Sequence, residues 1–424
     1  MRNDPDEVWQ RLQRIAQITT GSGPGVTRLA YTESEREAHR LVAGWFEELG
    51  LQVYTDPVGN TIAERAGQVP GLPAIGTGSH LDSVPEAGRF DGIVGVVAAV
   101  EVARRLVGEG IEHAHPFRFV VFAAEEGARF GQACIGSKAA AGQLTTAALD
   151  ELQDAGGVKL GDAMRAVGLS PDRLAEAAWD GKDWAGFVEL HIEQGQVLET
   201  AGTSIGLVDV VSGSTRLELT VRGQASHTGG TPMHLRSDAL AAAAEVVLTV
   251  EELANRPQCR GTRATVGRLV VEPGSITTIP GTVTFAVDVR DVDSDRQRAV
   301  AAEIIDAARS VGARRDVLVD LRLLADTSPV VLPARLRQLT TRACRDLGLS
   351  YRTMPSGASH DCQMINAVVP SALIFVPSRS GLSHVHTEWT EPAQIVAGID
   401  ALAASMLLMD AKSRSIRVRT ARAA

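Results

Sequence analysis

The first part of the chain combines helical periodicity with short apolar runs. Apolar positions three and four residues apart predict amphipathic helices over Asp6–Ile18 and Ser34–Leu49. Short apolar runs predict buried strands over Ala74–Gly78 and Phe117–Ala124, separated by a helix over Ile93–Leu106. A strand, helix and strand at this spacing are typical of a βαβ unit, so this region predicts a mostly parallel sheet.

The pattern changes in the middle of the chain. Thr215–Val221 alternates like a half-buried strand, and Thr231-Pro232 resembles an N-cap with proline at the first helical position. This predicts a helix that ends near Leu253. The elements predicted next are strands over Ala264–Val271 and Val283–Val289, a helix over Asp295–Val311 and a strand over Val317–Leu324. The β-α-β-β-α-β order is that of a split βαβ, ferredoxin-like domain.

After residue 326 the α/β pattern resumes. We predict a helix over Pro333–Leu347, a strand over Ala372–Val376 and a helix over Ala393–Met409. The simplest organisation is a small domain, residues 213–326, inserted into a larger α/β domain. The larger domain, residues 1–212 plus 327–424, is then completed by both ends of the chain.

Composition and charge narrow the class of protein. A chain of 424 residues is too long for a single hydrophobic core and is long enough for two domains. A composition of 44% apolar and 22% charged residues is typical of a soluble globular protein. A net charge of -9 argues against a nucleic-acid surface. The four cysteines form no CxxC pair, which suits a reducing cytoplasm. The N-terminus has no signal-peptide pattern and no apolar run reaches the roughly 18 residues of a membrane span, so we expect a cytoplasmic protein without a membrane partner.

Side chains that bind metals follow the predicted strands. Glu125 and Glu126 come directly after one strand. The others are His80 and Asp82 after the Ala74–Gly78 strand, Asp91 in the next loop, His191 at the end of another apolar run, and His384 and His386 after Ala372–Val376. Ligands of open α/β sheets bind at the carboxyl ends of strands, and a site without thiolate suits zinc, manganese or cobalt. The alternative is a surface edge, with Asp91 as a helix cap and both glutamates in water.

Three other histidines lie in polar surroundings. His39 falls on the polar face of a predicted helix, and His113 and His115 lie in a polar connection. We predict that these three side chains are solvated.

Seven segments carry a family resemblance. They are "GSHLDSVPEAGRFDG", "AAEEGARFG", "GSKAAAG", "ELHIEQGQVLE", "SHTGGTPMHLRSDAL", "SGASHDC" and "FVPSRSGLSHVHTEWT", and they run across almost the whole chain. The chain resembles the dinuclear-metal amidohydrolases of the aminoacylase/carboxypeptidase superfamily. Within them it resembles the hydantoinase/carbamoylase branch of N-carbamoyl-L-amino acid hydrolases, allantoate amidohydrolases and β-ureidopropionases. The resemblance implies a mixed-sheet metallohydrolase domain with an inserted lid and dimerisation domain, and therefore a homodimer.

The resemblance also implies roles for the strand-end residues. It implies two divalent ions, zinc or manganese with cobalt as a further candidate, bridged by Asp91. His80 and His191 would complete one ion, and Glu126 and His384 the other. Glu125 would be the general base, and Asp82 would orient His80.

Further residues are assigned to the substrate by the resemblance. His227 in "ASHTGG" would stabilise the oxyanion in its own or the partner subunit's site, Arg290 would bind a carboxylate, and Gln194 would bind the ureido or amide end. Plainer alternatives are a turn histidine, an arginine paired with Asp291 or Asp293, and a glutamine that supports its turn. His360 would line the pocket or else bond to Asp361.

Three positions depart from the family pattern. Thr277 stands where asparagine usually precedes "IPG", and one hydroxyl replaces a donor and an acceptor. Ser359 stands where glycine is common, and His386 where proline or a small residue is common. Thr277 puts the usual binding of the substrate α-carboxylate in doubt, and the three changes together predict an altered substrate preference.

The function predicted from these residues is metal-dependent hydrolysis of N-carbamoyl-L-amino acids, or of related ureido or N-acyl amino acids. The alternatives are an allantoate amidohydrolase and an aminopeptidase or dipeptidase of the same superfamily. A non-catalytic binder on a decayed scaffold should have lost ligands or the base, and all of them are present here. The expected partner is a small-molecule substrate.

Overall fold

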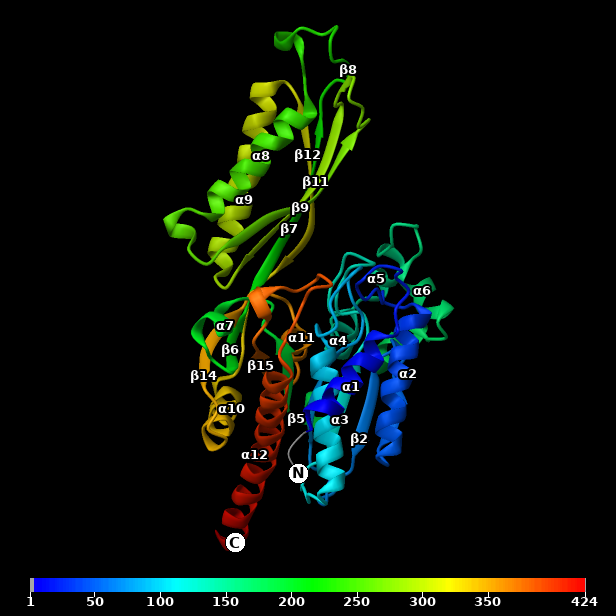
Figure 1. Ribbon diagram of the computed structural model, residues 1–424, viewed down its shortest axis with the longest axis vertical. Helices are drawn as coiled ribbons and strands as arrows, with labels where there is room; N and C mark the ends of the chain where they lie inside the picture. Colours follow the sequence, from blue (N-terminus) through cyan, green and yellow to red (C-terminus); the bar gives the residue numbers. More distant parts are fainter. Residues whose placement is uncertain (1–3, 424) are drawn as a thin grey trace. The chain divides into compact units, whose positions relative to one another are not determined.

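The chain forms two compact units in the computed structural model, which describes residues 4–423 and the side chains of residues 4–411 (Figure 1). The first unit holds the residues up to Asp209 and those from Leu332 onward. The second unit is Val210–Val331. Each unit has its own hydrophobic core.

A nine-stranded mixed sheet is the framework of the first unit. Its centre is four parallel strands in the order β4 (Phe117–Phe122), β3 (Ala74–His80), β5 (Trp184–Ile192) and β15 (Ser371–Val376). Antiparallel neighbours flank the centre, with β2 (Thr61–Arg65) and β1 (Gln52–Thr55) on one side and β6 (Ile205–Val211) followed by β13 (Val330–Val331) on the other. The two residues of β13 already belong to the second unit, as do the last two residues of β6. The strand β14 (Tyr351–Ser356) also pairs with β6. The predicted mixed α/β fold is confirmed.

Helices supply the two cores around this sheet. One core is shared by the strands and α1 (Pro5–Ala16), α2 (Glu33–Glu48), α3 (Ile93–Gly108), α10 (Ala334–Asp346) and α12 (Pro392–Ala423), and Figure 1 shows α3 and α12 side by side. A smaller core contains α4 (Ile135–Ala140), α5 (Thr146–Glu151) and α6 (Leu160–Ala166). The short helices α7 (Val197–Ala201) and α11 (Asp361–Ile365) complete the unit. Every residue of β3 and β15 is buried, as expected of central strands in a sheet that is packed on both faces.

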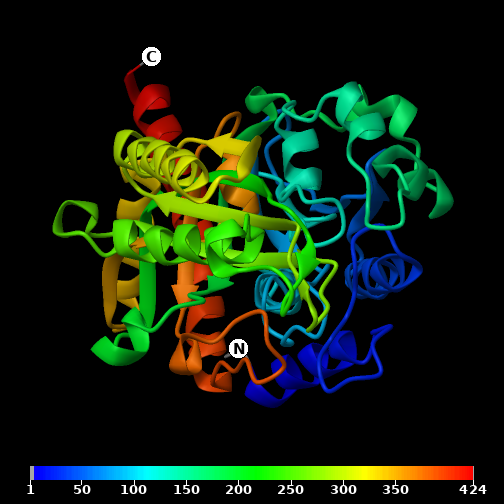
Figure 2. The ribbon, with the colours of Figure 1, turned by 90° about the horizontal axis from the view of Figure 1, so that it is seen from above.

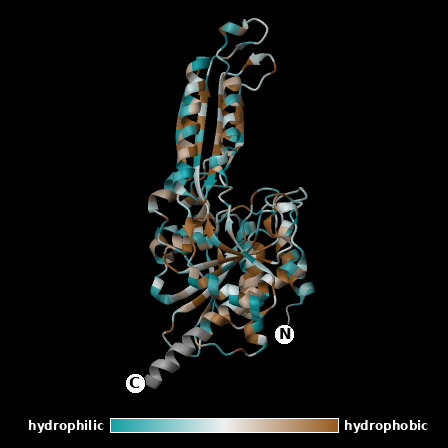
Figure 3. Ribbon diagram, turned by 90° about the vertical axis from the view of Figure 1, so that its left-hand side faces the viewer, coloured by the Kyte–Doolittle hydropathy of each residue, from teal (hydrophilic) through white to brown (hydrophobic). Residues whose placement is uncertain are grey.

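The second unit is an antiparallel sheet covered by two helices. Its strands are ordered β12 (Leu318–Thr327), β7 (Gly213–Arg222), β11 (Thr282–Asp291) and β9 (Arg263–Glu272). The helices α8 (Ala239–Ala254) and α9 (Ser294–Arg315) lie side by side on one face (Figures 1 and 2). Figure 3 shows both helices with mixed hydrophilic and hydrophobic turns, as expected of amphipathic helices. A two-stranded ribbon pairs β8 (Ser226–His227) with β10 (Thr278–Ile279).

The start of α8 differs from the prediction. Met233–Leu235 forms only a short 3-10 turn, and α8 begins at Ala239. The side chain of Asp238 caps the helix, because it accepts hydrogen bonds from the backbone N–H groups of Leu240 and Ala241. The predicted cap at Thr231 is therefore wrong, and the helix is capped seven residues later.

The three histidines expected in water are buried, so that prediction is wrong. His39, His113 and His115 are each 3% exposed. His39 Nδ1 lies 2.9 Å from Thr61 Oγ1, and the other two Nδ1 atoms donate to backbone carbonyl groups. The carboxylate of Asp410 on α12 accepts from the backbone of residues 114 and 115, which fixes this connection against the helix.

One helix in the described part of the chain is long and apolar enough for a membrane span by length and composition. It is the Pro392–Ala411 part of α12, and half of its most apolar window is buried inside the protein. A core helix of a soluble protein has the same properties, and α12 contributes to the core of the first unit.

Candidate metal centre

The predicted ligands follow the carboxyl ends of the four parallel strands. His80 is the last residue of β3, and His191 is the last but one of β5. Glu126 follows β4, His384 follows β15, and Asp91 lies between β3 and α3. Parallel strands end at one edge of a sheet, and the structure brings these five side chains together there.

The carboxylate of Asp91 is shared by two groups of donors. Its Oδ1 lies 3.1 Å from His191 Nε2 and 3.7 Å from His80 Nε2. Its Oδ2 lies 3.3 Å from His384 Nε2, which in turn lies 3.3 Å from Glu126 Oε2. In each group the ligand atoms lie within 4.8 Å of one another. Asp91 therefore has the geometry of a bridging carboxylate.

These two groups fit divalent cations chemically. Nitrogen and oxygen donors without thiolate suit zinc, manganese or cobalt. Glu126 Oε1 is buried without a hydrogen-bond partner. A buried carboxylate oxygen without a partner costs folding free energy unless a positively charged group contacts it. Gly92 has a φ of +71°, and a Cβ there would lie 2.5 Å from the ring of His80. Glycine thus allows the Asp91 loop to approach His80 closely.

Hydrogen bonds orient two of the imidazoles. His80 Nδ1 donates to the backbone oxygen of Asp82 at 3.2 Å, and His191 Nδ1 donates to that of Ile192 at 2.9 Å. In the neutral form of each ring, Nε2 then keeps its lone pair for a ligand. His191 Nε2 already accepts from the Gly92 N–H at 3.2 Å.

The clustered groups change one another's pKa values. Burial opposes ionisation of Asp91, but hydrogen bonds with His191 and His384 hold its pKa well below the usual range. Hydrogen bonds with Asp91 and Glu126 raise the pKa of His384 to about 11. Burial, followed by the charge of Asp91, raises the pKa of Glu126. Positive charge on these imidazoles would favour the ionised carboxylates, and a bound cation would act in the same way.

Glu125 lies beside these groups without belonging to either of them. Its side chain is buried, and Oε2 lies 3.8 Å from His80 Nε2. Burial raises the pKa of Glu125 to about 7. A carboxylate with a pKa near neutrality is suited to accept and return a proton at neutral pH.

Buried carboxylates hold the backbone that carries the two glutamates. Asp82 Oδ1 accepts from the Glu125 N–H at 2.8 Å, and Asp82 Oδ2 accepts from the Glu126 N–H at 3.0 Å. Glu35 Oε1 accepts from the Ala124 N–H at 3.1 Å. Asp82 Oδ1 also lies 3.5 Å from His80 Nδ1. Asp82 therefore contacts both His80 and the glutamate pair.

A further buried carboxylate holds the Asp91 loop. Glu388 Oε1 accepts from the backbone N–H groups of Phe90 at 2.9 Å and Asp91 at 3.1 Å. The hydroxyl of Ser383 lies 2.7 Å from Glu388 Oε2 and 2.8 Å from Asp91 Oδ2. Burial, together with the charge of Asp91, raises the pKa of Glu388 to about 7.

Gln194 lies next to the bridging carboxylate. Its Nε2 donates to Asp91 Oδ2 at 2.7 Å, while its Oε1 is buried without a hydrogen-bond partner. His384 and Gln194 thus approach the same oxygen of Asp91.

His360 is buried against the centre. Its ring centroid lies 4.5 Å from that of His191, and its Nε2 lies 3.0 Å from Ser356 Oγ. The preceding residue, Ser359, is half-buried. His386 is exposed and belongs to none of the metal-binding groups found among the described residues.

The remaining predicted residues lie in the second unit. His227 is exposed, and its Nδ1 accepts at 3.0 Å from the backbone N–H groups of both following glycines. The neutral ring therefore carries its proton on Nε2. Arg290 Nε donates to Asp288 Oδ2 at 2.9 Å. Thr277 is exposed, and its backbone oxygen accepts from Thr228.

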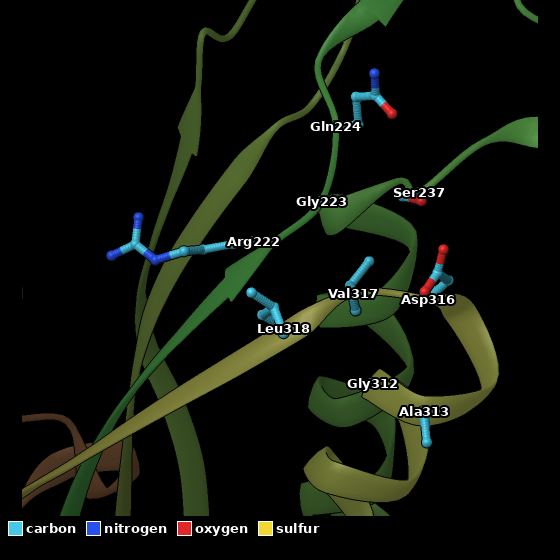
Figure 4. A pocket seen from close by; sticks show the side chains of 9 residues that line it. All are labelled: Arg222, Gly223, Gln224, Ser237, Gly312, Ala313, Asp316, Val317 and Leu318. Carbon is cyan, nitrogen blue, oxygen red and sulfur yellow. The ribbon is translucent and has the colours of Figure 1, made fainter.

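The second unit also contains a cavity of about 340 Å³ near the end of α9. Its lining includes Arg222, Gln224, Asp316 and Leu318 (Figure 4). The guanidinium of Arg222 is paired with Asp320 at 2.9 Å. None of the predicted site residues lines this cavity.

Sequence reasoning missed three residues that support the centre: Glu35, Cys134 and Glu388. Glu35 lies three residues after Thr32, the spacing of a helix capping box, which pointed to the helix end only. Glu388 follows His384 by four residues, and that proximity was the available signal. Cys134 gave no signal, because its contact with Glu125 depends on the path of the intervening loop.

The fold and the centre define a two-unit α/β protein with candidate metal ligands at the carboxyl ends of its parallel strands. The model of the peptidase family M20/M25/M40 matches residues 76–408. The chain belongs to this family.

Relatives agree with the family and with its predicted branch. The chain is 41% identical over 397 residues to the N-carbamoyl-L-amino acid amidohydrolase of Geobacillus stearothermophilus, covering 94% of this chain and 96% of that protein. It is 39% identical over 405 residues to the enzyme of the same name from Paenarthrobacter aurescens, covering 96% and 98%. The crystal structure of a hydantoinase/carbamoylase family amidase from Burkholderia vietnamiensis has a TM-score of 0.89, with 34% identity and coverage of 96% and 98%. The resemblance predicted from the motifs is confirmed.

Proposed function

We propose that this protein is a metal-dependent amidohydrolase that cleaves the C–N bond of N-carbamoyl-L-amino acids or closely related ureido or N-acyl amino acids. The observation that carries the proposal is the sharing of the Asp91 carboxylate by two donor groups, with Glu125 beside them. The names of the two bacterial relatives support the substrate class.

The proposed centre holds two divalent ions, zinc or manganese. His80 and His191 would hold one ion, Glu126 and His384 the other, and Asp91 both. When bound, such ions polarise the scissile carbonyl and lower the pKa of the attacking water. The residues around them orient these ligands and hold the backbone of the glutamate pair.

Glu125 is the proposed general base. It takes a proton from the attacking water and delivers that proton to the leaving nitrogen, which lets the C–N bond break. Its position supports this role, because Oε2 lies 3.8 Å from His80 Nε2 while Glu125 belongs to neither donor group. Asp82 holds the backbone of Glu125 during the transfer.

Substrate contacts are proposed for residues in both units. The Nε2–H of His227 would donate to the oxyanion that develops on the carbonyl. Arg290 would bind the substrate carboxylate, and Gln194 the ureido or amide end. His360, Ser359 and Thr277 would shape the pocket, with Thr277 weakening the carboxylate clamp. We further propose a cytoplasmic homodimer formed through the second unit.

A substrate panel on metal-loaded protein tests the proposal. We expect ammonia, carbon dioxide and a free amino acid from N-carbamoyl-L-amino acids, and slower turnover of allantoate and of dipeptides. Thr277→Asn should increase kcat/KM on ordinary N-carbamoyl-L-amino acids, because it restores a donor and an acceptor. Turnover of dipeptides alone would favour the peptidase alternative, and no turnover on the whole panel by protein with bound metal would overturn the proposed function.

A further inference from the structure

Cys134 contacts the proposed general base directly. Its Sγ lies 3.1 Å from Glu125 Oε1, and both side chains are buried. A thiol donates a hydrogen bond weakly, but a carboxylate is a strong acceptor, and no water competes in a buried site. Among the described residues, the other three cysteines are also buried, but no hydrogen bond joins them to Glu125.

The backbone fixes Cys134 in this position. Cys134 N–H donates to the backbone oxygen of Glu125 at 2.7 Å, and the next N–H, of Ile135, donates to that of Ala124 at 2.9 Å. Cys134 has a φ of +60°, which turns the chain from the loop into α4. The loop of residues 126–133 is therefore closed at its base by residue 134, whose side chain and backbone both bind residue 125.

The thiol contact separates the two oxygens of Glu125. Oε1 is occupied by Cys134 at 3.1 Å, whereas Oε2 lies on the side of His80, 3.8 Å from its Nε2. A carboxylate held at one oxygen loses much of its rotational freedom, so the other oxygen is presented in a fixed direction. Burial, together with the charge of Glu125, raises the pKa of the Cys134 thiol, so the donor stays protonated.

We propose that Cys134 is a positioning residue that holds Glu125 Oε1 and so directs Oε2 to the water it deprotonates. The inference rests on the proposed function, since it deepens the role of the same base. Cys134 itself exchanges no proton with the substrate.

Three single variants test the role of the thiol. Cys134→Ala removes the donor, and we expect kcat to fall about tenfold, the effect of losing a hydrogen bond to a charged group, with KM and bound metal unchanged. Cys134→Ser keeps a donor and should restore most of kcat. Cys344→Ala, at a buried cysteine of the α10 core, should leave kcat and KM at wild-type values. Equal kcat for wild type and Cys134→Ala, or equal losses in the Ala and Ser variants, would overturn the inference.

A double-mutant cycle separates positioning from general destabilisation. In a Glu125→Gln background, Cys134→Ala should cause no further loss of kcat, because the carboxylate that it orients is already gone. A further loss of similar size would show that Cys134 acts by another route and would overturn the inference.

An infrared measurement tests the contact without turnover. The S–H stretching band of Cys134 is isolated by subtracting the spectrum of Cys134→Ala, and we expect a lower frequency in wild type than in Glu125→Gln. Equal frequencies would overturn the contact. A frequency shift in a protein that turns over nothing on the panel would instead overturn the proposed function and leave the hydrogen bond supported.

Discussion

At the scale of single residues, adjacent glutamates have different surroundings. Glu126 Oε2 faces His384, whereas Glu125 is held by Cys134 and faces His80. We predict that Glu126→Ala loses one metal equivalent, while Glu125→Gln keeps both equivalents and loses about 10²- to 10⁴-fold in kcat, the usual contribution of a general base. Elemental analysis and steady-state kinetics on the same preparations measure both quantities. Full metal content in Glu126→Ala would contradict the ligand assignment.

Removal of metal should change the pH dependence of stability. The folded chain raises the pKa of Glu388 from 4.5 to about 7 and that of His384 from 6.5 to about 11. Both groups hold protons in the folded state that the unfolded chain has released, so stability falls as pH rises through these windows. We predict a lower Tm near pH 8 than near pH 5 for the chelated protein.

Two controls accompany the thermal measurement. Glu388→Gln should flatten the pH dependence of Tm between about pH 5 and 7, because the amide does not titrate. Adding zinc or manganese should reverse the trend, since metal binding requires deprotonated ligands. A chelated wild type whose Tm rises from pH 5 to pH 8 would contradict the prediction.

At the scale of elements, the end of β4 is held by side chains from elsewhere. Glu35 on α2 accepts from the Ala124 N–H, and the carboxylate is fully buried. We predict that Glu35→Ala destabilises the protein by about 1–3 kcal/mol, because a buried N–H loses its partner. Glu35→Gln keeps an acceptor and should cost less. Urea unfolding measures both, and Glu33→Ala, at the exposed start of α2, is the control.

The sequence predicted the helices and strands better than the long-range contacts between them. Strands β3, β4, β5 and β15 each contain a short apolar run, so their ends and the side chains that follow them could be predicted from the local sequence. The contacts from Glu388 to Asp91 and from Glu35 to Ala124 join residues 297 and 89 positions apart. No local period encodes such pairs. The burial of His113 was missed for the same reason, since α12 closes that connection from the far end of the chain.

At the scale of the whole molecule, the second unit has an exposed sheet edge. β12 is an edge strand, and Leu318, Leu321 and Leu323 on it are 71%, 40% and 58% exposed. Unpaired apolar edges favour pairing with another chain. We predict a dimer in light scattering with twice the mass of one chain, and a monomer for Leu321→Lys/Leu323→Lys. The control Leu269→Lys/Val270→Lys, on the opposite edge strand β9, should stay dimeric, and a monomeric wild type would contradict the prediction.

The change of pattern along the chain predicts an inserted small domain, whereas it predicts nothing about which surfaces of that domain are used. A strand edge has the same sequence whether or not a neighbouring chain covers it, and the edge strands β9 and β12 both carry exposed apolar side chains. The sequence also does not say whether His227 and Arg290 act in the site of their own subunit or in that of a partner subunit.

The two chain segments that connect the units pair with each other as antiparallel strands. Val210 and Val211 on β6 pair antiparallel with Val331 and Val330 on β13, and the Leu332 N–H donates to the Asp209 oxygen at 2.9 Å. The chain therefore leaves and re-enters the first unit at adjacent points, as a hairpin does at its turn. Replacing residues 212–329 by a two-residue turn would close that hairpin. The first unit then becomes a transplantable scaffold that carries all five candidate metal ligands, to which other inserted domains could be joined at the same point.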